Sequence, residues 1–348
     1  MRYSTLYRAH RTPIMTVWSA AVLILLAACE RKAPLEPNAE AASSAAMTAL
    51  TNSWSTRAPM PLPLISHTAA VVPNSSGVQI AYVVGGFSYA RNAVQAGTYA
   101  YNPNTNSWRT RAPMPIALMN TNGAVTINGK IYVSGGFSES FSHSNALLVY
   151  NPATNSWAKR APMPRRATHG VSAAMGGKLY VLIGNCIDCN QAPGRLVQQL
   201  WRYNPATDEW RQLKNSPRKH HAGVGGVING KWYVAGGNGN RALDVYDPST
   251  NTWSERVSMP SVHDVPGGAV LDQKLYVVGG LDVTTNATET VHAYNPATNT
   301  WKTRTPLSDP RAFLAAVKVV RNGNAVILAL GGHTDSEAEV PTNEEYDN

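Results

Sequence analysis

Tyr150-Asn151-Pro152-Ala153-Thr154-Asn155-Ser156-Trp157 is one copy of a block, Y-[ND]-P-x-T-[ND]-x-W, that recurs about every fifty residues. Its tryptophans are Trp54, Trp108, Trp157, Trp210, Trp253 and Trp301. Apolar runs ending in a glycine pair recur with the same period, at Gly85-Gly86, Gly135-Gly136, Gly236-Gly237, Gly279-Gly280 and Gly331-Gly332, with Gly184-Asn185 as the one departure. Repetition at this period indicates a propeller or a solenoid, because one such unit cannot bury both of its faces alone.

The two sets of markers are out of phase. Trp54 has no Gly-Gly before it, whereas the last Gly-Gly leads to Tyr346-Asp347-Asn348 without a following Trp. An unpaired sheet edge is a liability in a ring of sheets. We therefore expect the segment around Trp54 to supply the outer strand of the last unit, with residues 312 to 346 supplying its other three strands.

The pattern within one unit predicts four antiparallel strands. Residues 121 to 125 and 131 to 134 are predicted strands joined by a type I′ turn at Asn128-Gly129. A third strand is predicted at residues 146 to 150, and the Asn-Pro turn leads to a fourth that begins at Ser156. No stretch between the markers has a helical period. Six such units predict an all-β, six-bladed propeller over residues 51–348.

The repeat resembles the kelch repeat, which has Gly-Gly after the second strand, Tyr before Asp/Asn-Pro, and Trp on the fourth strand. The resemblance covers residues 51 to 348 in six registered copies. It implies a six-bladed kelch β-propeller. Because this fold carries enzymes, sugar-binding proteins and protein-interaction platforms alike, the fold assigns no function.

The N-terminus predicts secretion and lipidation. Arg2, Arg8 and Arg11 precede an uncharged run over residues 16–28, typical of a signal peptide. The run ends in Leu26-Ala27-Ala28-Cys29, which resembles a bacterial lipobox, a signal cut before a Cys that carries lipid. We thus expect a signal peptide at 1–28, a lipidated Cys29 that begins a flexible tether at 29–50, and a protein of the bacterial envelope, the outer membrane more than the inner.

Composition excludes several function classes. Only 15% of the residues are charged, and the net charge of +9 includes no basic run, so we expect no nucleic-acid partner. The chain has no Gly-rich phosphate loop, no H-E-x-x-H and no G-x-S-x-G. We expect no cofactor and no metal.

Cys186 and Cys189 form a C-x-x-C directly after the irregular Gly184-Asn185 copy. In an oxidising compartment a structural disulfide is the favoured interpretation. A redox pair and half of a metal site are the alternatives.

Strand direction assigns each connection to one of two faces. The loops from second to third strand, and from fourth strand to the next unit, share what we call the loop face; the short stereotyped turns share the opposite turn face. Function on a rigid scaffold is commonly placed on such loops. All four phenylalanines are predicted on the loop face: Phe87, Phe137, Phe141 and Phe313.

Counting back from each Gly-Gly predicts which residues open each inner strand near the propeller axis. These are His67, Asn120, His169, His221, Asp264 and Leu314, preceded by residues that include His220, His263 and Phe313. We predict ligand binding by His67, Asn120, His169, His220, His221, Phe87, Phe137 and Phe313. Such polar side chains can also simply hydrogen-bond neighbouring backbone and hold blades together.

These residues favour a noncatalytic binding protein whose ligand is a glycan or a partner protein. The hydroxyls of a sugar need hydrogen-bond donors and acceptors such as the imidazoles and the amide, and its C–H faces stack on aromatic rings such as those of Phe. The alternative is a sugar mutarotase or epimerase, which a distant resemblance to the periplasmic kelch sialic acid mutarotases implies. In that case His263 would act as the base, Asp264 would orient it, and Arg311 would bind the carboxylate of the sugar. A copper oxidase resembling galactose oxidase is disfavoured, because the only mature cysteines lie three residues apart in one loop.

Overall fold

The computed structural model describes residues 52–189, 195–335 and 339–348. Contacts divide the chain into Met1–Met47 and Thr48–Asn348, and all described residues belong to the second unit. The predicted signal peptide, Cys29 and the tether lie outside the described residues. Within them the regular elements are all strands, and no helix is long and apolar enough to cross a membrane.

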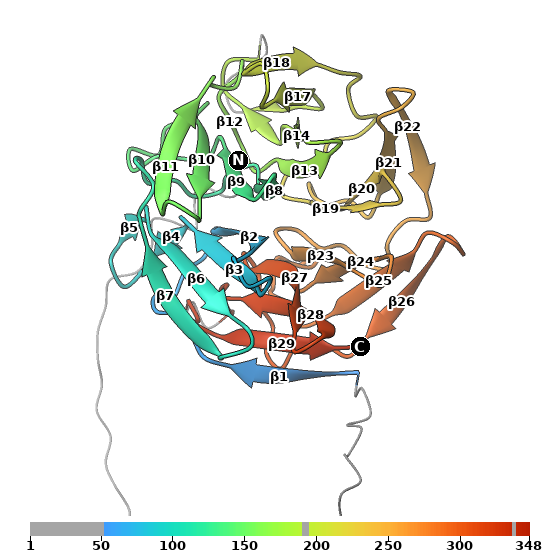
Figure 1. Cartoon of the computed structure of the whole chain (residues 1–348). Helices are drawn as coiled ribbons and strands as arrows, with labels where there is room; N and C mark the ends of the chain where they lie inside the picture. The colour runs from blue at the N-terminus through green and yellow to red at the C-terminus, as the bar shows by residue number, and fades with distance from the viewer. Residues whose placement is uncertain (1–51, 190–194, 336–338) are drawn as a thin grey trace, which may run out of the picture. The chain divides into compact units, whose positions relative to one another are not determined.

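Six four-stranded antiparallel sheets form a ring, with the first strand of each sheet nearest the axis (Figure 1). Blade 1 contains β2 (Thr68–Pro73), β3 (Gln79–Val84), β6 (Thr98–Asn102) and β7 (Ser107–Arg111). Blade 2 contains β8 (Ala124–Ile127), β9 (Lys130–Ser134), β10 (Leu147–Asn151) and β11 (Ser156–Arg160). Blade 3 contains β13 (Val171–Met175), β14 (Lys178–Leu182), β17 (Leu200–Asn204) and β18 (Glu209–Gln212).

Blade 4 contains β19 (Val224–Ile228), β20 (Lys231–Ala235), β21 (Leu243–Asp247) and β22 (Thr252–Arg256). Blade 5 contains β23 (Gly267–Leu271), β24 (Lys274–Val278), β25 (Val291–Asn295) and β26 (Thr300–Arg304). Blade 6 contains β27 (Ala315–Arg321), β28 (Asn324–Leu330), β29 (Asn343–Asp347) and β1 (Ser53–Arg57). The six-bladed, all-β prediction is confirmed.

The predicted closure of the ring is also confirmed. β1 pairs antiparallel with β29, with Trp54 opposite Tyr346, so the two ends of the described chain share one sheet. Within blade 2, Asn128 and Gly129 both have positive φ (49° and 72°), as a type I′ turn requires. The first strand of that blade begins at Ala124, later than predicted. Just before it, Asn122 Oδ1 accepts a hydrogen bond from the Gly170 N–H of blade 3 (2.9 Å).

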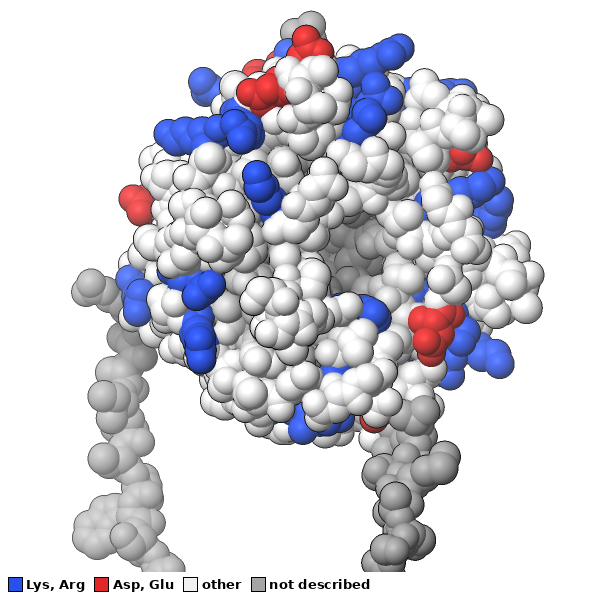
Figure 2. All heavy atoms as spheres, viewed as in Figure 1, with Lys and Arg blue, Asp and Glu red and all other residues white. Residues whose placement is uncertain are grey.

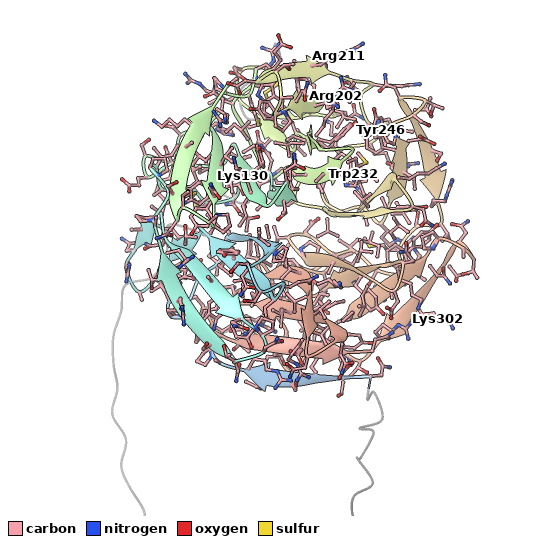
Figure 3. All side chains as sticks on the ribbon, in the orientation of Figure 1. Lys130, Arg202, Arg211, Trp232, Tyr246 and Lys302 are labelled. Carbon is pink, nitrogen blue, oxygen red and sulfur yellow. A yellow bond between two sulfur atoms is a disulfide. The ribbon has the colours of Figure 1, made fainter. Side chains whose placement is uncertain are left out.

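The core lies between blades. Alternate residues of each strand face opposite neighbours: in β9, Ile131 and Val133 pack with blade 1, whereas Tyr132 packs with blade 3. Six such clusters fill the six interfaces. In blade 4, Trp232 and Tyr246 both pack toward blade 3 (Figure 3).

The recurring block forms a clamp between neighbouring outer strands. The indole N–H of Trp157 donates to the carbonyl of Ala112 in blade 1 (2.9 Å), and the Ala112 N–H donates to Asn155 Oδ1 (2.9 Å). The Tyr150 hydroxyl donates to the same Oδ1 (2.7 Å). All six tryptophans donate in this way, at Trp54, Trp108, Trp157, Trp210, Trp253 and Trp301. The spacing of Tyr, Asn/Asp and Trp in the sequence is therefore the spacing that this clamp needs.

The Gly-Gly pairs lie where the next blade crosses closest. A Cβ on Gly135 would lie 2.3 Å from the carbonyl oxygen of Ala167, and the Gly136 N–H donates to that carbonyl (2.8 Å). In blade 3 Ile183 takes the first glycine position, since its N–H donates to the Gln199 carbonyl (3.0 Å) as the Gly135 N–H donates to the Ala146 carbonyl (2.9 Å). The second glycine is kept, because a Cβ on Gly184 would lie 2.1 Å from the His169 carbonyl oxygen of the same blade. Asn185, the residue after it, starts an extra strand.

Short strands decorate the loop face. β4 (Phe87–Ser88) pairs with β5 (Ala93–Val94). In blade 3, β15 (Asn185–Cys186) pairs with both β12 (Ala167–Thr168) and β16 (Arg195–Leu196).

Candidate functional site

Six backbone hydrogen bonds form a closed ring around the axis on the loop face. The N–H of one residue in each blade donates to the carbonyl of its counterpart in the preceding blade, at 2.8–3.0 Å. The six residues, which we call the axial ring, are Ser66, Asn120, His169, Ala222, Val265 and Phe313. All six have left-handed φ, between 47° and 58°. The backbone N–H groups of the axial ring are therefore engaged within the ring, and a ligand would be contacted by the side chains.

The side chains of the axial ring divide into two halves. Blades 1 to 3 contribute Ser66, Asn120 and His169, whereas blades 4 to 6 contribute Ala222, Val265 and Phe313. These six residues line a cavity of about 200 Å³ together with the first residues of the inner strands. The space-filling view has a hollow at the middle of the ring (Figure 2). The site therefore offers polar groups on one side and apolar surface on the other.

His169 and His221 stack beside this cavity, with ring centroids 4.6 Å apart and planes inclined by 32°. Phe137 meets His169 edge-on at 5.7 Å, and Thr168 Oγ1 lies 3.0 Å from His169 Nδ1. Burial lowers the pKa of His169 well below its usual value, with His221 and His143 adding to the effect. Burial likewise lowers the pKa of His221 to about 4. Both imidazoles are therefore neutral near pH 7.

Ser66 is a buried member of the polar half. Its Oγ is buried without a hydrogen-bond partner among the described residues. His67 is also buried, and burial lowers its pKa to about 4 against the opposing effect of the Leu330 and Leu64 backbone. Most buried hydroxyls have a partner, so the Ser66 Oγ is an unsatisfied buried group at the wall of the cavity.

Three predicted site residues serve instead to brace their own blades. His220 Nδ1 donates to the Gly236 carbonyl (2.8 Å), and His263 Nδ1 donates to the Gly279 carbonyl (2.6 Å). The Arg311 guanidinium donates to the Gly331 carbonyl (3.0 Å) and pairs with Glu344.

All three side chains are fully buried. This corrects the prediction of His220 as a ligand-binding residue and of His263 and Arg311 as base and carboxylate clamp, since their polar atoms are engaged and no ligand reaches them. Asp264, the third catalytic candidate, is half-buried and accepts the Gly239 N–H (3.0 Å).

The phenylalanines also differ from the prediction. Phe87 is buried against Ile65, Val94 and Met119, which corrects its assignment as a ligand-binding residue. Phe313 is a half-buried member of the axial ring, and Phe137 is half-buried beside it. Phe141 projects from its loop.

Four of the five exposed large hydrophobic side chains of the described residues lie on loop-face connections. Tyr89 is 40% exposed, Phe141 53%, Ile187 41% and Val283 76%. They belong to blades 1, 2, 3 and 5. Exposed apolar side chains on loops of a rigid scaffold are candidate contacts for a partner protein.

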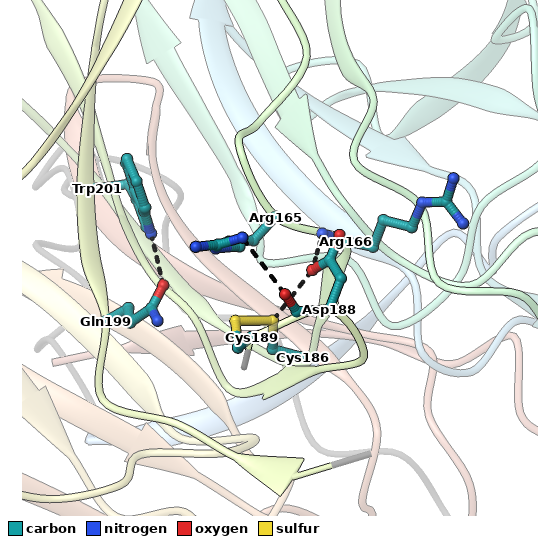
Figure 4. The surroundings of a disulfide bond; sticks show 7 residues. All are labelled: Arg165, Arg166, Cys186, Asp188, Cys189, Gln199 and Trp201. Carbon is teal, nitrogen blue, oxygen red and sulfur yellow. Dashed lines mark hydrogen bonds between the residues drawn. A yellow bond between two sulfur atoms is a disulfide. The ribbon is translucent and has the colours of Figure 1, made fainter. Parts of the chain in front are cut away.

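A disulfide joins Cys186 and Cys189 in the loop that departs from the repeat (Figure 4). Asp188 Oδ1 accepts the Arg166 N–H (3.0 Å), and the Asp188 carbonyl accepts from Arg165 (3.3 Å). The loop is thereby fixed to the segment that leads through β12 to His169. Cys186, Asp188 and Cys189 are close enough to share a metal ion, but the disulfide occupies both sulfurs.

Counting from the glycines placed two of six axial-ring members correctly, Asn120 and His169. It selected His67, His221, Asp264 and Leu314, each one residue away from the true member. One count from the glycines does not serve every blade, because β27 and β28 have seven residues each whereas β23 and β24 have five, and because Ile183, not Gly184, takes the first glycine position of blade 3. The ring positions share a left-handed backbone, and only two of the six, Asn120 and His169, are residue types enriched in that conformation.

Family comparisons agree with this architecture. Residues 66–268 match the family model described as the KLHDC2/KLHL20/DRC7 Kelch-repeats domain, and residues 266–308 match the Kelch motif. Kelch-like protein 38 of Danio rerio is 36% identical over 197 residues, 56% of this chain and 32% of that protein. Kelch repeat and BTB domain-containing protein 12 of Homo sapiens is 28% identical over 173 residues, 45% of this chain and 28% of that protein. The chain thus spans about a third of the length of these curated relatives.

A solved structure named "Structure of YjhT" superposes with a TM-score of 0.67. The match covers 82% of this chain and 95% of that chain at 20% identity, which supports the fold alone.

Proposed function

The chain belongs to the kelch-repeat family, and from that premise we propose that it is a noncatalytic binding module of the bacterial envelope that takes a neutral glycan at the axial ring. The observation that carries the proposal is the division of the ring into a polar and an apolar half above one cavity. A pyranose has hydroxyls along its edge and C–H groups on its face, so it matches such a site. Asn120 and His169, which are half-buried, would meet the hydroxyls, and Phe313 the C–H face.

Neutral imidazoles favour an uncharged ligand. His169 and His221 carry no charge near pH 7, and the described residues of the axial ring include no Lys, Arg, Asp or Glu. With His263 and Arg311 buried inside their blades, the residues required for the mutarotase alternative are absent from the cavity. Binding without catalysis is therefore the function that the site supports best.

A glycan array followed by calorimetry on the strongest glycan tests the proposal. Asn tolerates left-handed φ, so His169→Asn and Phe313→Asn change the site without new backbone strain, and each should weaken binding about tenfold or more. Asn128→Gly, at a turn-face position with φ 49°, is the matched control and should bind as the wild type does. Equal affinity in all four proteins would contradict the assignment of the site.

A partner protein is the second candidate ligand, favoured by the exposed side chains of Tyr89, Phe141, Ile187 and Val283. If no glycan binds, a partner captured by the wild-type protein should be lost with Phe141→Asp and Val283→Asp. Val257→Asp is the control, because Val257 is 44% exposed just after an outer strand. Retention of the partner by the loop variants would remove this candidate.

The lipobox-like sequence that ends at Cys29 supports the proposed display at the envelope. Fatty-acid labelling in cells should mark the wild-type protein, and Cys29→Ala should abolish the label and release the protein from membranes. Labelling that survives the substitution would refute lipidation at this residue.

A further inference from the structure

The axial-ring residue of blade 3 is held by a longer ladder than its counterparts. In blades 1, 2, 5 and 6, the residue before the ring member forms one isolated bridge to the residue after the second glycine position. In blade 3 the equivalent bridge joins Thr168 to Asn185, and a second pair, Ala167 with Cys186, extends it. His169 follows Thr168 directly, so this ladder fixes the backbone that carries its imidazole.

The disulfide closes the turn that follows this ladder (Figure 4). Between Cys186 and Cys189, the Asp188 carboxylate accepts the Arg166 N–H (3.0 Å), and the Ile187 N–H donates to the Arg166 carbonyl (3.3 Å). Both cysteines are buried in the cluster between blades 2 and 3. The disulfide therefore keeps a short turn in place, and that turn holds the segment that leads into the ring member.

A second route to the same imidazole runs through the neighbouring blade. Asn185 contacts the imidazole of His143 on the loop of blade 2, and Asn185 Oδ1 and His143 Nε2 are buried atoms with no other hydrogen-bond partner among the described residues. The His143 ring packs edge-on against Phe137 with centroids 4.6 Å apart, and Phe137 meets His169 edge-on at 5.7 Å. Side-chain packing thus joins the irregular loop of blade 3 to His169 a second time.

Of the side chains that contact the His169 imidazole, two depend on this loop. Thr168, whose Oγ1 lies 3.0 Å from Nδ1, belongs to β12, and Phe137 is reached through His143. A third contact, His221, belongs to blade 4. The backbone of His169 is left-handed (φ 52°), a conformation that persists only where the surroundings determine it. Loss of the loop's support should therefore move the imidazole.

We propose that the Cys186–Cys189 disulfide positions His169, so that ligand binding at the axial ring depends on the redox state of this pair. The inference rests on the proposed binding of a glycan at the axial ring and adds its regulation. Asn185 and His143 are the positioning residues of the second route. The oxidised protein is the binding form, which suits an oxidising compartment.

Reduction of the pair consumes a dithiol. One thiolate of the dithiol attacks a protein sulfur, the Sγ–Sγ bond breaks, and the mixed disulfide resolves to the oxidised, cyclic reductant and two protein thiols. Two electrons and two protons thereby pass from the dithiol to Cys186 and Cys189. The turn loses its covalent closure, so the ladder between β12 and β15 opens more readily and His169 is placed less firmly.

The first test reads the imidazole without any ligand. In NMR spectra of protein labelled at the histidine ring nitrogens, reduction with dithiothreitol should shift the signals of His169 and leave those of His292, in blade 5, unchanged. Cys186→Ser/Cys189→Ser should produce the same shifts, which removes any doubt over access of the reductant to a buried disulfide. Unchanged His169 signals in both proteins would overturn the proposal, whether or not a glycan is found.

The second test measures affinity for the strongest glycan of the array. The reduced protein and Cys186→Ser/Cys189→Ser should both bind about tenfold more weakly than the oxidised wild type. His143→Ala should weaken binding as well, and His143→Phe, which keeps an aromatic ring against Phe137, should restore it.

Trp301→Phe is the control for a general loss of stability, because it weakens a clamp between blades 4 and 5, and it should bind as the wild type does. Equal affinity of the oxidised and reduced proteins, for a glycan that His169→Asn binds poorly, would overturn the proposal. If the wild type binds no glycan, the proposed function fails, and the imidazole spectra alone decide whether the disulfide positions His169.

Discussion

The indole N–H of Trp54 donates to the carbonyl of Thr305 at 2.9 Å, across 251 residues of chain. The same bond joins Trp301 to Val257 between blades 5 and 4, where the chain is continuous. The clamp between blades 5 and 6 is therefore completed by the first described strand.

Deleting residues 51 to 61 should remove this clamp and expose the edge of β29. We expect a large fall in melting temperature and a tendency to associate, because the apolar face of Tyr346 loses Trp54 and a sheet edge opens. Trp54→Phe and Trp301→Phe should each cost about 1 kcal/mol by denaturant titration. A truncated protein that melts like the intact one would show that β1 does not close the ring.

Arg311 and Glu344 form a buried ion pair that braces blade 6. Arg311→Met should destabilise the protein by about 3–5 kcal/mol, because it leaves the Glu344 carboxylate buried without its cation. Adding Glu344→Leu should recover part of that loss, since the unpaired charge is gone. If Arg311→Met left stability intact but abolished ligand binding, Arg311 would belong to the site after all.

Asp208 replaces Asn in the blade 3 clamp. The Tyr203 hydroxyl and the Ala161 N–H hold the pKa of its carboxyl below the usual value. A lowered folded-state pKa means that the carboxylate stabilises the fold above the unfolded-state pKa of about 3.8, and that this is lost as pH falls through the lower folded-state value. Wild type and Asp208→Asn should therefore converge in melting temperature in strong acid and differ near neutrality; a constant difference across pH would contradict this.

We expect His67 to make the protein less stable in mild acid. Its folded-state pKa of about 4 lies below the unfolded-state value of 6.5, so the unfolded chain binds a proton that the folded chain does not. Stability should fall as pH drops from about 6.5 toward 4, by up to about 3 kcal/mol for this group. Urea titrations at both pH values should show a smaller drop for His67→Gln, and an unchanged slope would refute burial as the cause.

The Cys186–Cys189 disulfide should make both cysteines unreactive toward alkylating reagents. Alkylation of the folded protein should modify neither cysteine until a reductant is added, and Cys186→Ser/Cys189→Ser should cost about 2 kcal/mol, since the closed loop is short. Rapid alkylation without reductant would show the thiols to be free.

The clamp and the glycine pairs made the fold predictable, because both depend on residue types that few others can replace. Trp donates its N–H across the blade interface. Position 135 requires glycine, because a Cβ there would lie 2.3 Å from the Ala167 carbonyl oxygen. The axial ring was less predictable, because it is built by backbone atoms that any residue supplies: Val265 occupies it at φ 49° despite its branched side chain. Histidines such as His220 and His263 looked like ligands in sequence, and only their contacts show that they brace the blades.

The closing strand also fixes where mechanical load enters the molecule. A pull on the chain before residue 52 is transmitted to β1, five residues held to blade 6 by backbone pairing and by the indole of Trp54. The other five blades each end in an outer strand that is covalently continuous with its own sheet. Under tension the propeller should yield first at its sixth blade, and its resistance to force is that of one short strand rather than of the ring.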